Sequence, residues 1–158
     1  VLTDGRLYFG DSGEEYKAVY AKDGLGMKML MQSGVEGGII TARSAPLVAK
    51  RMENLGIQHF YQGQSDKVPP FEEMAHKLGL SHQQVAYVGD DLIDLPVMSR
   101  VGLSIAVSDA HPEVIQRAHW TTPQAGGLGG ARNVCDLIMS AQGTLQAMIE
   151  GQVRGITN

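Results

Sequence analysis

Short apolar segments alternate along the chain with longer segments in which apolar residues recur at helical spacing. The short segments are typical of buried strands, and the longer ones are typical of amphipathic helices. Because the links between them are short, the alternation favours a mostly parallel sheet covered by helices on both faces. We therefore predict an α/β fold with a doubly wound, mostly parallel sheet. Strands are expected at 35–41, 59–61, 84–88, 103–107 and 119–122, and helices at 25–33, 45–55, 66–78, 92–100, 111–117 and 131–149.

A different pattern precedes the first helix. Residues 6–10 and 15–20 flank a turn-forming sequence at 10–13, which predicts an antiparallel β-hairpin. An isolated two-stranded ribbon is only marginally stable in water, so we expect the hairpin to pack against another surface. Its apolar side chains are Leu7, Phe9, Val19 and Tyr20.

The composition excludes several classes of protein. Of the 158 residues, 43% are hydrophobic and 19% are charged, as in a packed globule and unlike a disordered chain. The net charge of −4 supplies no basic field for nucleic acid or an anionic membrane. A single cysteine, Cys135, excludes a disulfide framework and is compatible with a reducing compartment. We predict a single cytoplasmic domain, residues 1–158, that binds neither nucleic acid nor membrane.

Polar side chains follow three of the predicted strands. Thr41 ends one strand, Lys67 follows the next, and Asp90, Asp91 and Asp94 follow a third. The carboxyl ends of parallel strands meet at one edge of a sheet, where ligands gather. A hydroxyl and an ammonium can hold phosphoryl oxygens there, while carboxylates hold a hard cation. The sequence thus predicts a site for Mg²⁺-assisted phosphoryl transfer.

Each of these elements also has a structural interpretation. A threonine at a strand end is commonly a polar cap. Asp91 and Asp94 could serve as an N-cap and a first-turn acid of the helix that follows. Capping needs one acid, whereas three acids within five residues repel one another unless a cation lies among them. We therefore predict that Asp90, Asp91 and Asp94 are metal ligands.

Three segments, in this order, resemble the second, third and fourth motifs of phosphatases of the haloacid dehalogenase superfamily: 39–43, 61–67 and 88–94. Within the superfamily, the chain is similar to the small sugar-acid phosphatases, in which a protruding hairpin stands in place of a cap domain. The similarity extends over nearly the whole chain. It also covers the segments 2–8, 22–24, 55–57, 110–112 and 134–138.

The resemblance implies a Mg²⁺-dependent phosphomonoesterase. Its expected reaction is hydrolysis of 3-deoxy-D-manno-octulosonate 8-phosphate through an aspartyl-phosphate, a step in making a lipopolysaccharide precursor. Thr41 would hydrogen-bond the phosphoryl group, and Lys67 would neutralise its charge. Asp90 would ligate Mg²⁺, with Asp91 and Asp94 as further ligands or as support for Asp90 and Lys67.

The resemblance also concerns substrate and assembly. Arg43 and Arg51 would face the carboxylate of the sugar acid, which a guanidinium binds in a bidentate fork. Relatives that act on a nine-carbon sugar acid phosphate usually carry an acid at the position of Arg43, so the eight-carbon substrate is favoured and the nine-carbon one stays an alternative.

In the family the hairpins of four subunits assemble a small barrel, which implies a homotetramer.

The family's nucleophile lies in an Asp-x-Asp-Gly motif directly before the segment that Val1–Gly5 resembles. The first aspartate attacks phosphorus and the second acts as general acid and base. Asp4 corresponds to a later turn and is not a substitute. We therefore expect the nucleophile upstream of Val1, on the central strand of the sheet, in a longer protein.

Two other classes of protein fit part of this pattern. A signalling receiver domain also combines aspartates, threonine and lysine on a doubly wound sheet. It carries its acids first, however, whereas here Thr41 and Lys67 precede Asp90. A non-catalytic oligomerisation module derived from the phosphatase fold is the other alternative. The presence of Thr41, Arg43, Lys67 and Asp90 together favours the enzyme.

Overall fold

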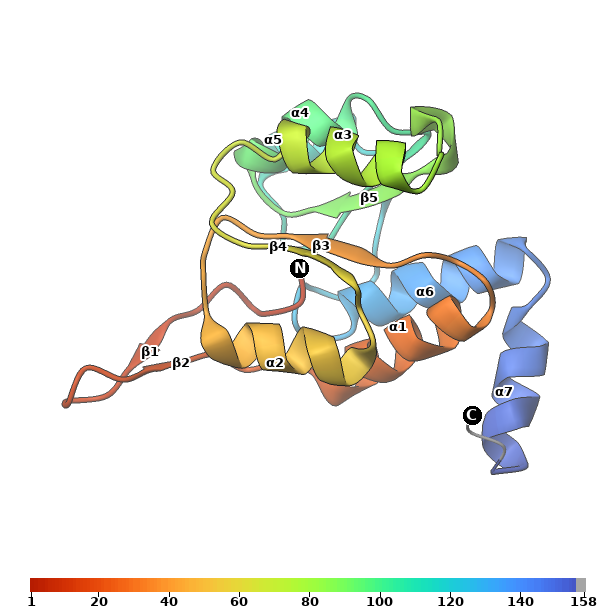
Figure 1. Ribbon diagram of the computed structural model, residues 1–158, viewed down its shortest axis with the longest axis horizontal. Helices are drawn as coiled ribbons and strands as arrows, with labels where there is room; N and C mark the ends of the chain where they lie inside the picture. Colours follow the sequence, from red (N-terminus) through yellow and green to blue (C-terminus); the bar gives the residue numbers. More distant parts are fainter. Residues whose placement is uncertain (156–158) are drawn as a thin grey trace.

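The structure is a computed structural model that describes residues 1–155 and has an α/β architecture (Figure 1). Residues 156–158, which the predicted domain includes, lie outside the described residues. Strand β3 (Gly38–Ile40) pairs in parallel with β4 (His59–Tyr61). A second parallel sheet contains β5 (Ala86–Gly89), β6 (Leu103–Ala106) and β7 (Trp120–Thr121), in that order. The predicted α/β class with parallel strands is confirmed.

Helices cover the strands from two sides. In Figure 1, α3, α4 and α5 lie above the strands, and α1, α2 and α6 lie below them. Among the described residues, none of the helices combines the length and the apolar content that a membrane span requires. The helices are α1 (Ala21–Gln32), α2 (Pro46–Leu55), α3 (Val68–Lys77), α4 (Leu95–Met98), α5 (Pro112–Arg117), α6 (Gly130–Ala141) and α7 (Leu145–Val153).

Several helix ends follow from proline and glycine. Pro46 begins α2, where a missing N–H is tolerated, and Gly56 ends it with a left-handed φ of 79°. The prediction of one helix over 131–149 is wrong, because Gly143 adopts a φ of 71° and separates α6 from α7. The predicted helix at 92–100 is also shorter, with a 3-10 turn at Leu92–Asp94 before α4.

The predicted hairpin is present but short. Strand β1 (Tyr8–Phe9) pairs antiparallel with β2 (Glu15–Tyr16), and the pair projects from the body of the molecule (Figure 1). Its aromatic side chains are largely exposed, Phe9 by 68%. Packing within the described chain therefore does not stabilise this ribbon.

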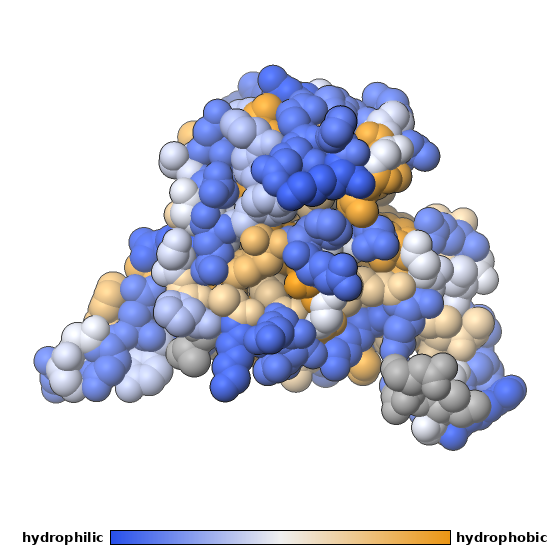
Figure 2. All heavy atoms as spheres, viewed as in Figure 1, coloured by the Kyte–Doolittle hydropathy of each residue, from blue (hydrophilic) through white to orange (hydrophobic). Residues whose placement is uncertain are grey.

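One apolar cluster joins the two sheets. Phe71 of α3 is 1% exposed and lies in a buried cluster with Val97 and Val101. Ile40 of β3 and Tyr87 of β5 pack against the same cluster. Strand ladders do not connect β3 to β5 within residues 1–155, so side-chain packing under α3 holds the sheets together. The gap between β3 and β5 lies where the family resemblance places the central strand of the sheet. Figure 2 shows apolar surface in the band between the two groups of helices.

Removing the phenyl ring of Phe71 should loosen this joint. We expect Phe71→Ala to lower the free energy of unfolding by about 3–5 kcal/mol, because it leaves a cavity where both sheets meet. Leu128→Ala is the matched control: this side chain is 59% exposed, and its loss should cost no more than about 0.5 kcal/mol. Urea titration followed by circular dichroism measures both. Equal losses in the two variants would contradict the assigned role of Phe71.

Candidate active site

Thr41 is fixed by hydrogen bonds between the loops that follow β3 and β4. Its backbone N–H donates to the carbonyl oxygen of Tyr61 at 2.9 Å, and its carbonyl accepts from the N–H of Gln64 at 3.0 Å. The Thr41 hydroxyl oxygen accepts from the N–H of Arg43 at 3.3 Å. The loop that contains Gln64 continues to Lys67. These hydrogen bonds therefore hold Thr41 close to the loop that leads from β4 to the lysine.

Lys67 stands directly before α3, and its ammonium is buried. The nitrogen Nζ donates to Oδ1 of Asp94 at 2.6 Å, and the two side chains are only 10% and 2% exposed. A buried charge of this kind is stable only when an opposite charge and hydrogen bonds compensate for its lost hydration. Asp94 supplies that compensation, so the two residues form one unit.

Four donors converge on the carboxylate of Asp94. Oδ1 accepts from Lys67 and from the Tyr87 hydroxyl at 2.8 Å. Oδ2 accepts from the backbone N–H groups of Asp90 and Asp91 at 3.0 and 3.2 Å. Burial by itself would raise the pKa of Asp94, but the Lys67 ammonium together with these hydrogen bonds holds the pKa below its ordinary value. Asp94 therefore stays ionised at neutral pH.

Gly89 allows Asp94 to turn back toward β5. A Cβ atom at position 89 would lie 2.6 Å from the Cβ of Asp94 and 2.7 Å from the sulfur of Met98. Only a residue without a side chain permits this approach without displacing the aspartate. The glycine that ends β5 is thus part of the machinery that orients Asp94.

Asp90 and Asp91 have different surroundings. Asp91 caps the turn that follows it, with Oδ1 accepting from the N–H of Leu92 at 2.7 Å. The Asp90 side chain is 43% exposed, and its Oδ2 lies 2.5 Å from the backbone nitrogen of Val1. Its backbone is held separately, since its carbonyl accepts from the N–H of His111 at 2.9 Å.

The predicted set of three metal ligands does not form as expected. Within residues 1–155, no group of three or more His, Cys, Asp or Glu side chains is arranged to hold a metal ion. Each oxygen of Asp94 already accepts two donors, and one of these donors is the lysine ammonium. This favours the expected support of Lys67 over the expected metal ligation, which stays a prediction. Asp90 keeps a suitable oxygen donor, since Mg²⁺ commonly uses one or two carboxylates and takes its other ligands from water and phosphate.

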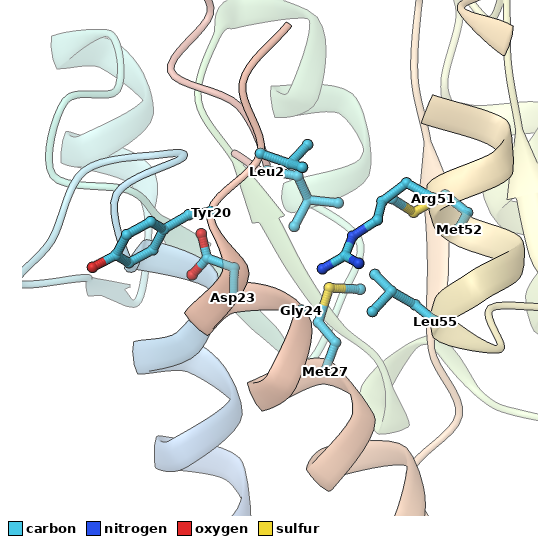
Figure 3. A pocket seen from close by; sticks show the side chains of 9 residues that line it. Leu2, Tyr20, Asp23, Gly24, Met27, Arg51, Met52 and Leu55 are labelled. Carbon is cyan, nitrogen blue, oxygen red and sulfur yellow. The ribbon is translucent and has the colours of Figure 1, made fainter. Parts of the chain in front are cut away.

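The two predicted substrate arginines lie in different places. Arg43 is exposed, and its Nη1 lies 4.0 Å from Oε1 of Glu15 on the hairpin. Arg51 points from α2 across a small pocket toward α1, where a Cβ on Gly24 would lie 2.5 Å from its Nη2 (Figure 3). Thr41, Lys67 and Asp90 are not among the residues that line this pocket.

Two polar side chains that the structure withdraws from water, one partly and one fully, were not predicted. The Tyr87 hydroxyl donates to Asp94. The one sequence signal for this role is a hydroxyl group in an otherwise apolar strand. Asp23 is 2% exposed, and its Oδ1 accepts from the N–H of Arg132 at 2.8 Å, near the start of α6. Within residues 1–155, its Oδ2 has no hydrogen-bond partner, and burial raises the pKa of this carboxyl. Asp23 lies in the segment 22–24, where the family resemblance assigned no role.

Sequence comparison relates the chain to known hydrolases. Residues 56–130 match the family of haloacid dehalogenase-like hydrolases. The 3-deoxy-D-manno-octulosonate 8-phosphate phosphatase of Escherichia coli K12 is 53% identical over 145 residues, which cover 92% of this chain and 77% of that protein. This chain belongs to the haloacid dehalogenase-like hydrolases. The resemblance seen in the three motifs is thereby confirmed.

Solved structures support the assignment of this chain to the haloacid dehalogenase-like hydrolases. The 3-deoxy-D-manno-octulosonate 8-phosphate phosphatase from Yersinia pestis superposes with a TM-score of 0.91 at 50% identity, over 92% of this chain and 79% of that one. The enzyme of the same name from Moraxella catarrhalis, solved with a magnesium ion, a phosphate ion and a KDO molecule, gives a TM-score of 0.92 at 39% identity. It covers 95% of this chain and 86% of its own.

The buried pair gives this hydrolase a pH-dependent stability. Because the folded-state pKa of Asp94 is lowered, its contribution is fully present above the unfolded value of about 3.9 and is lost as the pH falls through the folded value. Lys67→Met should lower the free energy of unfolding by about 3 kcal/mol at pH 7, since it leaves a buried carboxylate without its cation. The difference from wild type should narrow below about pH 4, where protonation removes that charge.

Urea titrations between pH 3 and pH 7 measure this difference. Lys77→Met is the matched control, because Lys77 forms an exposed pair with Glu73 one helical turn away and should contribute little at any pH. A Lys67→Met deficit that stays constant with pH would show that the pairing with Asp94 is not its cause.

Proposed function

We propose that this protein is a Mg²⁺-dependent phosphomonoesterase that hydrolyses 3-deoxy-D-manno-octulosonate 8-phosphate to the free sugar acid and phosphate. The observation that carries the proposal is the match to the Moraxella catarrhalis enzyme, whose structure contains magnesium, phosphate and KDO. The Lys67–Asp94 pair and Asp90 supply the charges that binding of a phosphoryl group requires. Because the chain is similar to the 3-deoxy-D-manno-octulosonate 8-phosphate phosphatases, we also place the reaction in the cytoplasm as a step toward a lipopolysaccharide sugar.

Each residue at the strand ends has a separate task in this proposal. The Thr41 hydroxyl donates its proton to a phosphoryl oxygen, since its oxygen already accepts from Arg43. The Lys67 ammonium, held by Asp94, balances the negative charge on the group being transferred. Asp90 would hold Mg²⁺, which, when bound, polarises the phosphoryl group. Asp91 shapes the turn that presents Asp90.

Substrate recognition is assigned to Arg43. Its guanidinium is 59% exposed, lies two residues beyond Thr41, and can form a bidentate pair with the carboxylate of the sugar acid. The contact of Arg51 with α1 supports a packing role, and its predicted contact with the substrate stays a prediction.

We assign the nucleophile to a segment that precedes Val1 in the full-length protein. Strands β3 and β5 each have one hydrogen-bonded neighbour in residues 1–155, which leaves the edges that face each other able to pair with a further strand. Val1 lies beside Asp90, so a strand leading into it would end at the carboxylate that we assign to the metal. An aspartate on that strand would attack phosphorus and form the aspartyl-phosphate.

We further propose that the protein assembles as a homotetramer through the hairpin. Tyr8, Phe9 and Tyr16 are 46%, 68% and 56% exposed on a ribbon that has no packing partner in the described chain. A ribbon of this size needs such a partner to be stable. Equivalent hairpins of other subunits would cover these aromatic side chains.

The reaction is tested by phosphate release from 3-deoxy-D-manno-octulosonate 8-phosphate by the full-length protein. We expect activity with Mg²⁺, no activity after EDTA treatment, and a loss of at least about 10²-fold in Asp90→Asn, because the metal loses its carboxylate. Asp11→Asn, an exposed change in the hairpin turn, is the matched control. Full activity of Asp90→Asn would refute the assignment. A higher kcat/KM for a nine-carbon sugar acid phosphate would select the alternative substrate.

Assembly is tested by light scattering coupled to size exclusion at micromolar concentration. The full-length protein should have the mass of four subunits, and Phe9→Asp should reduce that mass because a buried charge opposes hairpin packing. Val153→Asp, an exposed site on α7, should leave the mass unchanged. A monomeric mass for the wild type would contradict the proposal.

A further inference from the structure

Tyr87 shares one carboxylate oxygen with the buried lysine. Its hydroxyl lies 2.8 Å from Oδ1 of Asp94, and the Lys67 ammonium lies 2.6 Å from the same atom. The tyrosine comes from β5 and the lysine from the residue before α3, so the two donors approach Oδ1 from different elements. The other oxygen, Oδ2, accepts only the two backbone N–H groups of Asp90 and Asp91.

The direction of these hydrogen bonds is fixed by chemistry. An ammonium can only donate and a carboxylate can only accept, so the Tyr87 hydroxyl must give its single proton to Asp94. Burial raises the pKa of Tyr87 well above its ordinary value, and the nearby Asp94 charge raises it further. The hydroxyl is therefore a neutral donor throughout the physiological range.

When two donors share one acceptor oxygen, each of the two hydrogen bonds is weaker than it would be alone. If the hydroxyl were absent, Oδ1 would interact with Lys67 alone, and more of the ammonium charge would be neutralised by Asp94. The lysine alone would then contact the Oδ1 side of Asp94, so the ammonium would be placed less firmly, while the two backbone N–H groups still hold Oδ2. Both effects reduce the positive potential available to a phosphoryl group at the strand ends.

We infer that Tyr87 is a positioning residue of the phosphatase site, which acts through Asp94 to set the place and the effective charge of Lys67. This role rests on the proposed function. It differs from a role in metal binding, because Tyr87 contacts the Oδ1 side of Asp94, whereas Asp90 is held through Oδ2.

Tyr87→Phe in the full-length protein removes the hydroxyl and keeps the ring that packs against the Phe71 cluster. We expect kcat to fall about tenfold, with KM changed by less than about twofold, because the charge that Lys67 balances grows in the transition state. The apparent affinity for Mg²⁺ should stay at the wild-type value. Ser99→Ala is the matched control, since its exposed hydroxyl donates to the carbonyl oxygen of Pro96 at 3.0 Å and its loss leaves Lys67 and Asp94 untouched.

A double-mutant cycle tests whether Tyr87 acts through Asp94. In an Asp94→Ala background the added Tyr87→Phe change should reduce kcat by less than about twofold, because the shared acceptor is gone. Thermal unfolding of every variant shows whether it is folded. If Asp94→Ala does not fold, the kcat and KM values of the single Tyr87→Phe variant decide the question.

The outcomes separate this inference from the proposed function. Wild-type protein without phosphatase activity would refute the function. An active wild type with an unchanged kcat in Tyr87→Phe, an effect on KM alone, or an equal loss in Ser99→Ala would overturn the positioning role. A tenfold loss that persists in the Asp94→Ala background would also overturn it.

Discussion

A lysine ammonium that is nearly withdrawn from water constrains the structure around it. The charge of Lys67 needs Asp94 at hydrogen-bond distance, and Asp94 in turn needs the backbone N–H groups of the next loop to be turned toward it. That turn requires the missing side chain of Gly89, and the lysine requires α3 to begin where it does. Strand end, loop and helix start are therefore fixed together by the cost of burying one charge.

The elements of the fold could largely be predicted because each has a local cause. Strand β4 agrees with its predicted bounds, and Gly56 ends α2 as its position indicates. The gap between β3 and β5 agrees with the expectation, taken from the family resemblance, that the central strand lies upstream of Val1. The break between α6 and α7 depends on Gly143 adopting a positive φ, although glycine is also tolerated inside helices.

The site could be predicted in its residue types more than in its contacts. Thr41, Lys67 and Asp90 follow parallel strands, and topology alone places them at strand ends. Asp94 was expected either as a metal ligand or as support for Lys67. Sequence spacing could not choose between these roles, because it does not show which way a buried carboxylate faces, and the structure shows Asp94 bound to the lysine. Arg51 was assigned through the family resemblance, and its contact with Gly24 depends on how α1 and α2 pack.

The common acceptor of Lys67 and Tyr87 has a consequence for how such a protein can change over generations. A guanidinium in place of the lysine would meet the Tyr87 hydroxyl at the same oxygen, Oδ1, while its charge would still require Asp94. Replacement of any one of the three residues therefore leaves the other two poorly matched, and a viable route passes through simultaneous or closely spaced changes. Homologous chains should accordingly keep or exchange these three positions as a set.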